Sequence, residues 1–301
     1  MAPMTIVEGR RLALSNLEKV LYPSSGTTKG ELVHYYARTA PVMLPHLYGR
    51  PVSFLRYPDG PEGQKFFTKN VPPHAPEWVQ TYEIPRSDGT VNEHVLVQDV
   101  PSLLWAANLV VEFHTTTWRT TAGRGLADLL VFDLDPGKGA TVVDCCTVAQ
   151  WLHGRLTADG LSVYPKTSGS VGLHVLVPIT LTPAKRATAY AKSLAEEAER
   201  ALPDLVVHRM TRSLRPGKVF IDYSQNAAAK TTATAYTVRA RQTPTVSTPV
   251  TWAEIEACTQ PDQLAFQIDD IFDRLEDHGD LMAPLTAPDR SSPLPADPPA
   301  T

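Results

Sequence analysis

The sequence predicts an α+β fold, in which helices alternate with strands that carry acidic side chains. Residues 128–180 show the pattern of a strand, a helix and two further strands. A helical pattern begins at Thr182-Pro183 and reaches Leu202, and a basic strand around Asp222 follows it. The chain has 301 residues and 43% hydrophobic content, which is enough for one large domain or two small ones.

The N-terminal part is expected to hold one helix and several short strands. A strand or loop opens the chain, and Thr28-Lys-Gly-Glu31 has the pattern of a capping box. The helix would continue through Tyr35 and end before Pro41. This arrangement places Lys29 in the first helical turn. Residues 50–100 alternate short apolar runs with proline and glycine, which predicts strands joined by loops.

Two aspartates at the end of an apolar run form the first candidate site. Residues 129–137 read Leu-Leu-Val-Phe-Asp-Leu-Asp-Pro-Gly. Residues two apart on a strand project from the same face, so Asp133 and Asp135 should point the same way. Buried carboxylates are costly without a cation, and hard oxygen ligands favour magnesium or manganese. An Asx turn that closes the strand is the structural alternative.

A turn of small residues forms the second candidate site. Residues 167–174 read Thr-Ser-Gly-Ser-Val-Gly-Leu-His and lead into an apolar strand. Such a turn can present backbone N–H groups and the Ser168 hydroxyl to an anion. His174 could add a donor to a phosphate, and a histidine that only completes the structure is the alternative.

A lone acid among basic residues forms the third candidate site. Asp222 ends a β-branched and aromatic strand, and residues 205–241 hold seven Lys or Arg against this one acid. The pattern suits a metal ligand beside a polyphosphate, whereas a plain salt bridge is the alternative. Three acids on two strands, a Ser/His turn and an arginine cluster together indicate nucleotidyl transfer. In that reaction two metals bridge the attacking and leaving oxygens, and cations neutralise the triphosphate.

The order of these motifs resembles the polymerase domain of bacterial ligase D, a branch of the archaeo-eukaryotic primase superfamily that serves non-homologous end joining. The resemblance covers about residues 5–275. It implies a primase-type catalytic core with an RRM-like sheet that bears the metal acids, plus an N-terminal α/β part. We therefore expect a single primase-polymerase domain over residues 1–282, with a DNA-end-binding part at about 1–120 and the catalytic core at about 121–282. A Pro-rich disordered tail should occupy residues 283–301.

The resemblance also implies roles for individual residues. The catalytic and metal-binding acids are Asp133, Asp135 and Asp222. The nucleotide-binding residues are His114, which would lie near the sugar, and Ser168, His174, Arg215, Gln225 and Arg239. The pocket for the 5′-phosphate of a downstream DNA strand consists of Asn16, Lys19 and Lys29. Phe66 and Phe67 would stack on the template, and a hydrophobic core pair is the alternative for them.

The implied function is a template-dependent polymerase that fills short gaps or broken ends in DNA repair by two-metal catalysis with Mn²⁺ or Mg²⁺. It would use NTPs and dNTPs, with ribonucleotides preferred. Val171 departs from the family pattern, because many members carry Lys or Arg there, so one positive contact to the triphosphate should be missing. Two other functions remain open: a non-catalytic DNA-end-bridging module and a metal-dependent nuclease.

The remaining expectations concern partners and location. Ligase D also carries a ligase and a phosphoesterase, which these 301 residues lack, so a separate DNA ligase and Ku are the expected partners. The net charge of −4 means that local basic patches would have to guide DNA. We expect a cytoplasmic protein without membrane contact, associated with the nucleoid when bound to DNA. Cys145 and Cys146 should be core residues without a disulfide or a zinc knuckle.

Overall fold

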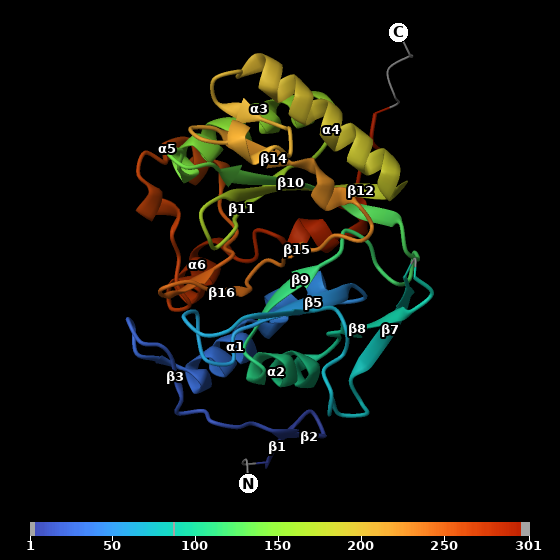
Figure 1. Cartoon of the computed structure of the whole chain (residues 1–301), viewed down its shortest axis with the longest axis vertical. Helices are drawn as coiled ribbons and strands as arrows, with labels where there is room; N and C mark the ends of the chain where they lie inside the picture. The colour runs from blue at the N-terminus through green and yellow to red at the C-terminus, as the bar shows by residue number, and fades with distance from the viewer. Residues whose placement is uncertain (1–3, 87, 296–301) are drawn as a thin grey trace. The chain divides into compact units, whose positions relative to one another are not determined.

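The computed structural model describes residues 4–86 and 88–295, which form two compact units (Figure 1). The first unit contains the chain up to Thr116, then Thr231–Ser247 and Phe266–Gly279. The second unit contains Thr117–Lys230, Thr248–Ala265 and the residues from Asp280 onward. The first crossing lies close to the expected boundary at residue 120. Two later segments return to the first unit, so the second unit is discontinuous in sequence, and the division into a DNA-end-binding part and a catalytic core stays a prediction.

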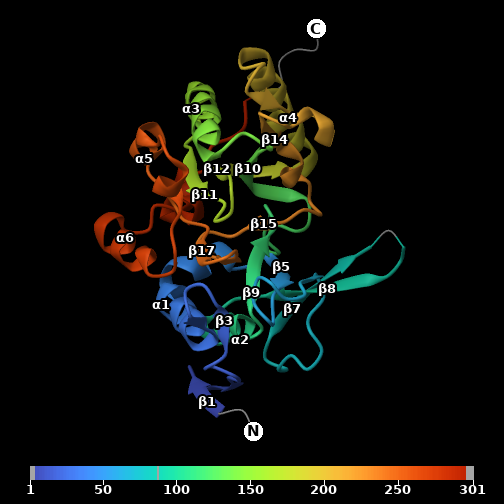
Figure 2. The same ribbon diagram turned by 60° about the vertical axis from the view of Figure 1, so that its left-hand side comes forward.

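The first unit is built on a six-stranded antiparallel sheet with the order β15-β9-β5-β8-β7, to which β6 adds by pairing with β5. Its strands are β5 (Pro51–Arg56), β6 (Phe66–Thr68), β7 (Gln80–Pro85), β8 (Val91–Leu96), β9 (Val111–Thr115) and β15 (Thr232–Ala233). Strands β7 and β8 form a long hairpin (Figure 2). The prediction of strands and loops over residues 50–100 is confirmed.

Smaller elements complete the first unit. Two helices, α1 (Lys29–Leu47) and α2 (Val100–Asn108), pack against each other. Three two-stranded ribbons join β1 (Met4–Val7) to β2 (Arg10–Ala13), β3 (Val20–Tyr22) to β4 (Thr27–Thr28), and β16 (Val238–Ala240) to β17 (Pro244–Val246). The returning segment ends in α6 (Asp270–His278), where the Phe272 ring lies 5.9 Å from the Tyr35 ring. This long-range packing explains why the segment joins the first unit.

Helix α1 begins as predicted and ends later than predicted. Thr28 Oγ1 accepts from the backbone N–H of Glu31, and the Glu31 carboxylate accepts from Thr28 N, which completes the capping box. The helix continues through Pro41 and Pro45 to Leu47. A proline inside a helix costs about 3 kcal/mol or more. Burial along the whole helix outweighs the cost of the two prolines, since Leu32, Tyr35, Tyr36, Met43 and Leu47 are all buried and a buried side chain of this size contributes about 1.5–3 kcal/mol.

The second unit holds a five-stranded sheet with the order β11-β12-β10-β14-β13. The strands are β10 (Leu126–Pro136), β11 (Tyr164–Thr167), β12 (Leu173–Pro183), β13 (Val206–Val207) and β14 (Val219–Asp222). Helices α3 (Val142–Ala158) and α4 (Ala184–Ala201) both pack on β10 and contact each other, so they cover one face (Figures 1 and 2). The predicted order of strand, helix, strand and strand is confirmed as β10, α3, β11 and β12.

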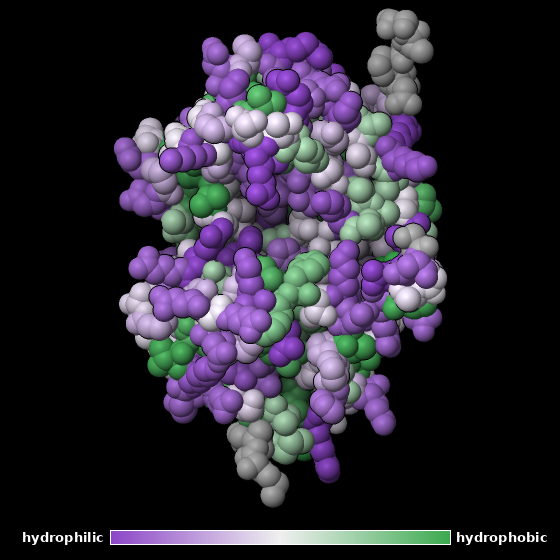
Figure 3. Space-filling model, viewed as in Figure 1, coloured by the Kyte–Doolittle hydropathy of each residue, from purple (hydrophilic) through white to green (hydrophobic). Residues whose placement is uncertain are grey.

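The core of the second unit lies between this sheet and its two helices. Phe132 and Leu134 of β10 and Ile221 of β14 are fully buried. Cys145 and Cys146 of α3 are buried too, as predicted, and burial raises the pKa of both thiols. Polar residues cover much of the molecular face in Figure 3, with apolar residues scattered between them. Among the described helices, none combines the length and the apolar character that a bilayer span requires.

The end of the chain differs from the expected disordered tail. Short 3₁₀ turns occupy Ala283–Thr286 and Pro288–Arg290, and Leu294 is buried. The main chain of Ser292 forms a bridge with Ile179 of β12. The disorder prediction is therefore wrong for residues 283–295, because the edge of β12 offers backbone partners that composition alone does not reveal. Residues 296–301 lie outside the described part.

The remaining short elements of the second unit are α5 (Trp252–Ala257) and the 3₁₀ turns η1 (Arg212–Leu214), η2 (Tyr223–Asn226) and η3 (Pro261–Leu264). The helix predicted at Thr182 starts at Ala184 and has no side-chain cap. Thr182 donates its hydroxyl to the Thr180 carbonyl at 2.7 Å instead. The turn η2 directly follows β14, so it holds its residues beside Asp222.

Candidate active site

Four polar side chains form a row across the sheet of the second unit. Asp133 on β10 is the direct strand partner of Asp222 on β14 and of His174 on β12. His174 is in turn the direct partner of Lys166 on β11. Opposite residues on antiparallel strands share a face, with Cβ atoms about 4.5–5.5 Å apart. The register therefore brings two of the three predicted acids and the predicted histidine together.

Asp135 lies on the same face of β10 as Asp133, because strand side chains alternate with a period of two. Its partner on β14 is Phe220. Between the two acids, Leu134 points the opposite way and is fully buried. The alternation places the apolar side chains of β10 against α3 and α4 and leaves the acids on the other face, which we call the acid face. The prediction that both acids point the same way is confirmed.

Hydrogen-bond donors hold the carboxylates of Asp133 and Asp222. Gln225 Nε2 donates to Asp222 Oδ2 at 3.0 Å and approaches Asp133 Oδ2 at 3.4 Å. Ser224 donates to Asp222 Oδ1 through its backbone N–H at 3.0 Å and through its hydroxyl at 2.5 Å. His174 Nε2 lies 3.2 Å from Asp133 Oδ1. The predicted residue Gln225 thus bridges two of the predicted acids.

The donor chemistry of the acid face fits a divalent cation. Three carboxylates share one face, and hard oxygen ligands are those that Mg²⁺ and Mn²⁺ prefer. In the described residues, no three His, Cys, Asp or Glu side chains already converge tightly enough to enclose an ion. The strand register therefore brings suitable ligands to one face of the sheet, but their side chains do not yet form a complete coordination shell.

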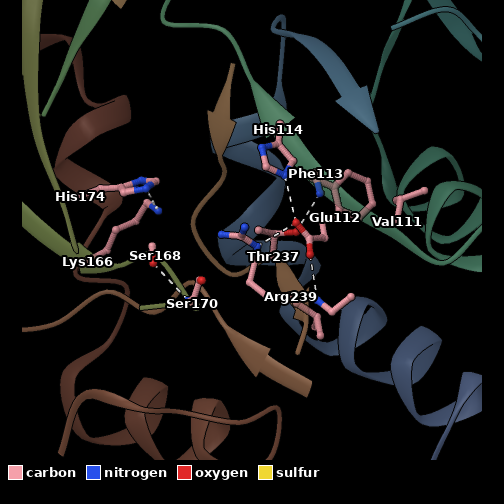
Figure 4. A network of polar contacts seen from close by, with 12 residues as sticks. Val111, Glu112, Phe113, His114, Lys166, Ser168, Ser170, His174, Thr237 and Arg239 are labelled. Carbon is pink, nitrogen blue, oxygen red and sulfur yellow. Dashed lines mark hydrogen bonds and ion pairs between the residues drawn. The ribbon is translucent and has the colours of Figure 1, made fainter. Parts of the chain in front are cut away.

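The Ser168 turn packs directly beside the acid strand. Ser168 Oγ accepts from the backbone N–H of Ser170 at 3.1 Å (Figure 4). It also accepts from the backbone N–H of Gly172 at 3.2 Å. A Cβ atom on Gly172 would lie 2.0 Å from the carbonyl oxygen of Leu134, so only glycine permits this approach. Val171 is 56% exposed at the tip of the turn. The turn therefore lies next to the strand segment between Asp133 and Asp135.

Arg215 also reaches the acid face. Its guanidinium stacks 3.7 Å from the ring centroid of Phe220, the strand partner of Asp135. A Cβ atom on Gly137 would lie 1.9 Å from the Arg215 carbonyl oxygen, which explains the glycine after Asp135 and Pro136. The arginine and the acids are thus brought together by the close packing of two backbone segments.

Other basic residues of the sequence cluster have partners of their own or belong to the first unit. Arg209 pairs with Glu199 at 3.0 Å, and Lys218 donates to the Pro203 carbonyl. Arg239 and Arg241 belong to the first unit. Of the seven cations, Arg215 reaches the acid face, and the expectation that the others gather around Asp222 stays a prediction.

In the first unit, a buried carboxylate joins two of the predicted nucleotide-binding residues. Glu112 Oε2 lies 2.8 Å from Arg239 Nε and 3.2 Å from His114 Nε2, and Ala240 N donates to Oε1 at 2.8 Å (Figure 4). Burial raises the pKa of Glu112, but the His114 hydrogen bond, the Arg239 charge and the Ala240 N–H outweigh it, and the pKa lies below its usual value.

Sequence reasoning missed Glu112 and Lys166. Glu112 lies two residues before His114 on β9, so a period of two places both on one face. Lys166 is a charged residue in the short strand directly before the Ser168 turn, and it is almost fully buried. Both positions could have been noticed as ionisable residues within strand patterns, but their partners could not.

The predicted 5′-phosphate pocket is brought together in the first unit. The backbone N–H of Lys29 donates to the Lys19 carbonyl at 2.8 Å, and Lys29 Nζ lies 3.4 Å from Ser15 Oγ. Asn16 adopts a positive φ of 54° in the loop just before Lys19. Lys19 Nζ contacts Asp59 at 2.5 Å. Burial, together with the charge of Lys19, lowers the pKa of Lys29 to about 8.

Phe66 and Phe67 do not form a core pair. They lie on β6 and are 44% and 58% exposed. Apolar rings that stay in contact with water gain free energy when a partner covers them, and base faces are suitable partners. The alternative of hydrophobic packing is therefore wrong, and template stacking stays a prediction.

Comparison with known proteins agrees with these motifs. The family described as LigD, primase-polymerase domain, matches residues 28–282. The multifunctional non-homologous end joining protein LigD of Mycolicibacterium smegmatis is 43% identical over 280 residues, which are 92% of this chain and 36% of that protein. The bifunctional LigD of Bacillus subtilis is 30% identical over 272 residues, 89% of this chain and 43% of that protein. The chain thus spans well under half the length of these relatives.

A solved structure shows the same fold. The polymerase domain from Mycobacterium tuberculosis ligase D in complex with DNA has a TM-score of 0.86 and 38% sequence identity, and the match covers 92% of this chain and 99% of that one. This match confirms the predicted primase-type α+β core. The family match, the identities and the shared fold together show that this chain belongs to the LigD primase-polymerase family, whose members are metal-dependent, DNA-directed nucleotidyltransferases.

Proposed function

We propose that this protein is a template-dependent DNA repair polymerase that fills short gaps or broken ends and prefers ribonucleotides. The observation that carries the proposal is the strand register that aligns Asp222, Asp133 and His174, with Asp135 on the same face. Three carboxylates beside an anion-suited turn fit nucleotidyl transfer, because metal ligands and phosphate donors must act on neighbouring atoms of one substrate.

Within the second unit, some residues would bind metal ions and others would bind phosphates. Asp133, Asp135 and Asp222 would hold two Mn²⁺ or Mg²⁺ ions. When bound, these ions supply the charge that eases attack of a 3′-hydroxyl on the α-phosphate. Ser168, His174 and Arg215 are the donors on this side that suit triphosphate oxygens. Gln225 bridges two of the acids, so its amide would orient them.

The residues of the first unit would recognise the sugar and the DNA. His114 and Arg239 share the Glu112 carboxylate, which fits a role in holding the nucleotide sugar and phosphates. Phe66 and Phe67 would stack on template bases. Asn16, Lys19 and Lys29 would bind the 5′-phosphate of a downstream strand, and a buried lysine suits a terminal phosphate because the anion restores its charge.

The decisive experiment is primer extension on a short gapped duplex. We expect extension that depends on Mn²⁺ or Mg²⁺, is faster with ribonucleotides than with deoxynucleotides and is stronger when the downstream strand carries a 5′-phosphate. Tight DNA binding without extension would replace the proposal with an end-bridging module. Degradation of labelled DNA without nucleotides would replace it with a nuclease.

The phosphate pocket has its own test. A Lys19→Ala, Lys29→Ala double variant should lose the preference for 5′-phosphorylated gaps, while the exposed control Lys192→Ala should keep it. Because the pKa of Lys29 is lowered to about 8, its charge is present at pH 7 and is lost as the pH rises. The preference should therefore be weaker at pH 9 than at pH 7. Equal affinity of the wild-type protein for phosphorylated and unphosphorylated gaps at pH 7 would refute the pocket.

The family's biology suggests partners for this reaction. The named relatives are non-homologous end joining proteins, and the related ligase D structure holds DNA. We extend the proposal to broken chromosomal DNA in the bacterial nucleoid as the place of action, with Ku at the ends and a DNA ligase to seal them. Pull-down of each purified partner on a DNA end tests this extension.

A further inference from the structure

Lys166 is a buried cation at the end of the polar row in the second unit. Only 1% of its surface is exposed. It lies on β11, and the segment Thr248–Val250 pairs with the opposite edge of that strand through Thr167 N to Thr248 O and Val250 N to Pro165 O. Lys166 Nζ lies 3.0 Å from His174 Nδ1 (Figure 4). The strand register therefore points the lysine at the histidine of the Ser168 turn.

The two contacts of the His174 ring are compatible with one neutral tautomer. An ammonium group has three donors and no acceptor, so His174 Nδ1 must accept from Lys166. The proton of the neutral ring then resides on Nε2, which lies 3.2 Å from Asp133 Oδ1 and donates to it. The other tautomer would place an N–H against the ammonium group and leave Nε2 without a proton to share with the carboxylate.

We infer that Lys166 is a positioning residue that holds His174 in the Nε2–H tautomer and aims this donor at the acid face. The consequence for the reaction rests on the proposed function: a phosphate oxygen only accepts hydrogen bonds, so a nucleotide beside Asp133 needs the donor on this nitrogen. Lys166 supplies that orientation from behind the ring and does not touch the substrate.

A role in packing alone explains the arrangement less well. Burying an ammonium group is costly, and a methionine of similar length would fill the same space without that cost. The strand register also aligns Lys166, His174 and Asp133, so that the lysine points at one side of the histidine ring and the aspartate lies at the other. Packing alone does not require this alignment. The geometry therefore connects the buried ammonium group to the orientation of the histidine that it contacts.

The first test reads the tautomer directly by ¹⁵N NMR of histidine-labelled protein without DNA or nucleotide. The wild-type protein should show a protonated Nε2 and an unprotonated Nδ1 for His174, assigned with a His174→Gln variant. Lys166→Arg, which also offers only donors, should keep this pattern, whereas Lys166→Met should give a mixture. A protonated Nδ1 in the wild-type protein would overturn the inference even if no variant folds. An unchanged tautomer in folded Lys166→Met would also overturn it.

The second test measures nucleotide use in the primer-extension assay. Lys166→Met should lower kcat/KM by roughly 10- to 100-fold, as expected when a partner that orients a histidine is lost, and mostly through a higher KM. Lys166→Arg should recover much of the loss, and the exposed control Lys192→Met should match the wild-type protein. Wild-type kinetics for Lys166→Met would refute the inference. If the wild-type protein fails to extend primers, the proposed function falls while the tautomer result still decides the inference.

Discussion

Glu112 in the first unit and Asp222 in the second are both carboxylates on strands, but their charges are compensated in different ways. Glu112 is buried and lies 2.8 Å from the Arg239 guanidinium, with two further donors around it. Asp222 is half-buried, and its partners in the described part of the chain are the neutral donors of Ser224 and Gln225. An ion-paired carboxylate mainly stabilises the fold, and we call the Glu112–Arg239 pair the clamp. A carboxylate held by neutral donors keeps a net charge that can bind a metal ion.

The largest expected effect comes from Asp222→Asn. The amide keeps the shape of the side chain but removes the charge, so primer extension should fall by roughly three orders of magnitude, because an ion contributes several kcal/mol and each 1.36 kcal/mol is tenfold. The free energy of unfolding should change by less than about 1 kcal/mol. Rapid-quench extension and urea unfolding measure the two quantities. Extension close to the wild-type rate would remove Asp222 from the metal ligands.

For Glu112→Ala we expect a large loss of stability, in contrast to Asp222→Asn. Loss of this carboxylate leaves the Arg239 charge without its buried partner, which should lower the free energy of unfolding by about 3 kcal/mol. Glu112→Gln, which keeps an acceptor oxygen, should cost less and serves as the matched control. Urea unfolding measures both. A stability loss larger in Asp222→Asn than in Glu112→Ala would reverse the comparison.

The clamp should also weaken in acid. In the folded protein the pKa of Glu112 lies below its usual value. As the pH falls, Glu112 is therefore protonated in the unfolded chain at a higher pH than in the folded protein. The stabilisation is fully present above the unfolded pKa of about 4.3 and is lost as the pH falls through the lower folded pKa. The stability difference between the wild-type protein and Glu112→Gln should therefore shrink between pH 7 and pH 3. A difference that stays constant in urea titrations over this range would contradict the clamp.

The smallest effect is expected for Gln225→Ala. This change removes one neutral donor that contacts both Asp133 and Asp222, and a typical hydrogen bond contributes about 1 kcal/mol. The two carboxylates would then repel each other more, so added Mn²⁺ should raise the Tm of Gln225→Ala more than that of the wild-type protein. Asp222→Asn is the control and should show the smallest rise. Equal shifts in all three proteins would mean that Gln225 does not offset the acid charges.

Local patterns were enough to predict elements of both units. The spacing of Asp133 and Asp135 predicted one shared face, and the order of strand, helix, strand and strand over residues 128–180 is confirmed. The capping box at Thr28 was also predictable, because all its atoms lie within one helical turn. These features depend on neighbouring residues, whose period and chemistry are visible in the sequence.

Other features were decided by the meeting of distant segments. The prolines in α1 predicted that the helix would end, but burial of the helix stabilises its continuation. The backbone of Ser292 pairs with β12, which the composition of this segment does not indicate. The seven basic residues near Asp222 in sequence belong to both units, because the chain returns to the first unit at Thr231. In each case the energy comes from packing or pairing with a segment far away in the sequence.

The sequence by itself predicted which residues would carry the chemistry: the acids, the Ser168 turn, His174 and the lysines of the N-terminal loop. Only the tertiary structure decided their partners. It paired Asp133 with Asp222, placed Lys166 behind His174, and joined Glu112 to Arg239 across 127 residues. The physical reason is that side-chain direction follows from local backbone period, whereas strand register and buried ion pairs exist only once remote strands have met.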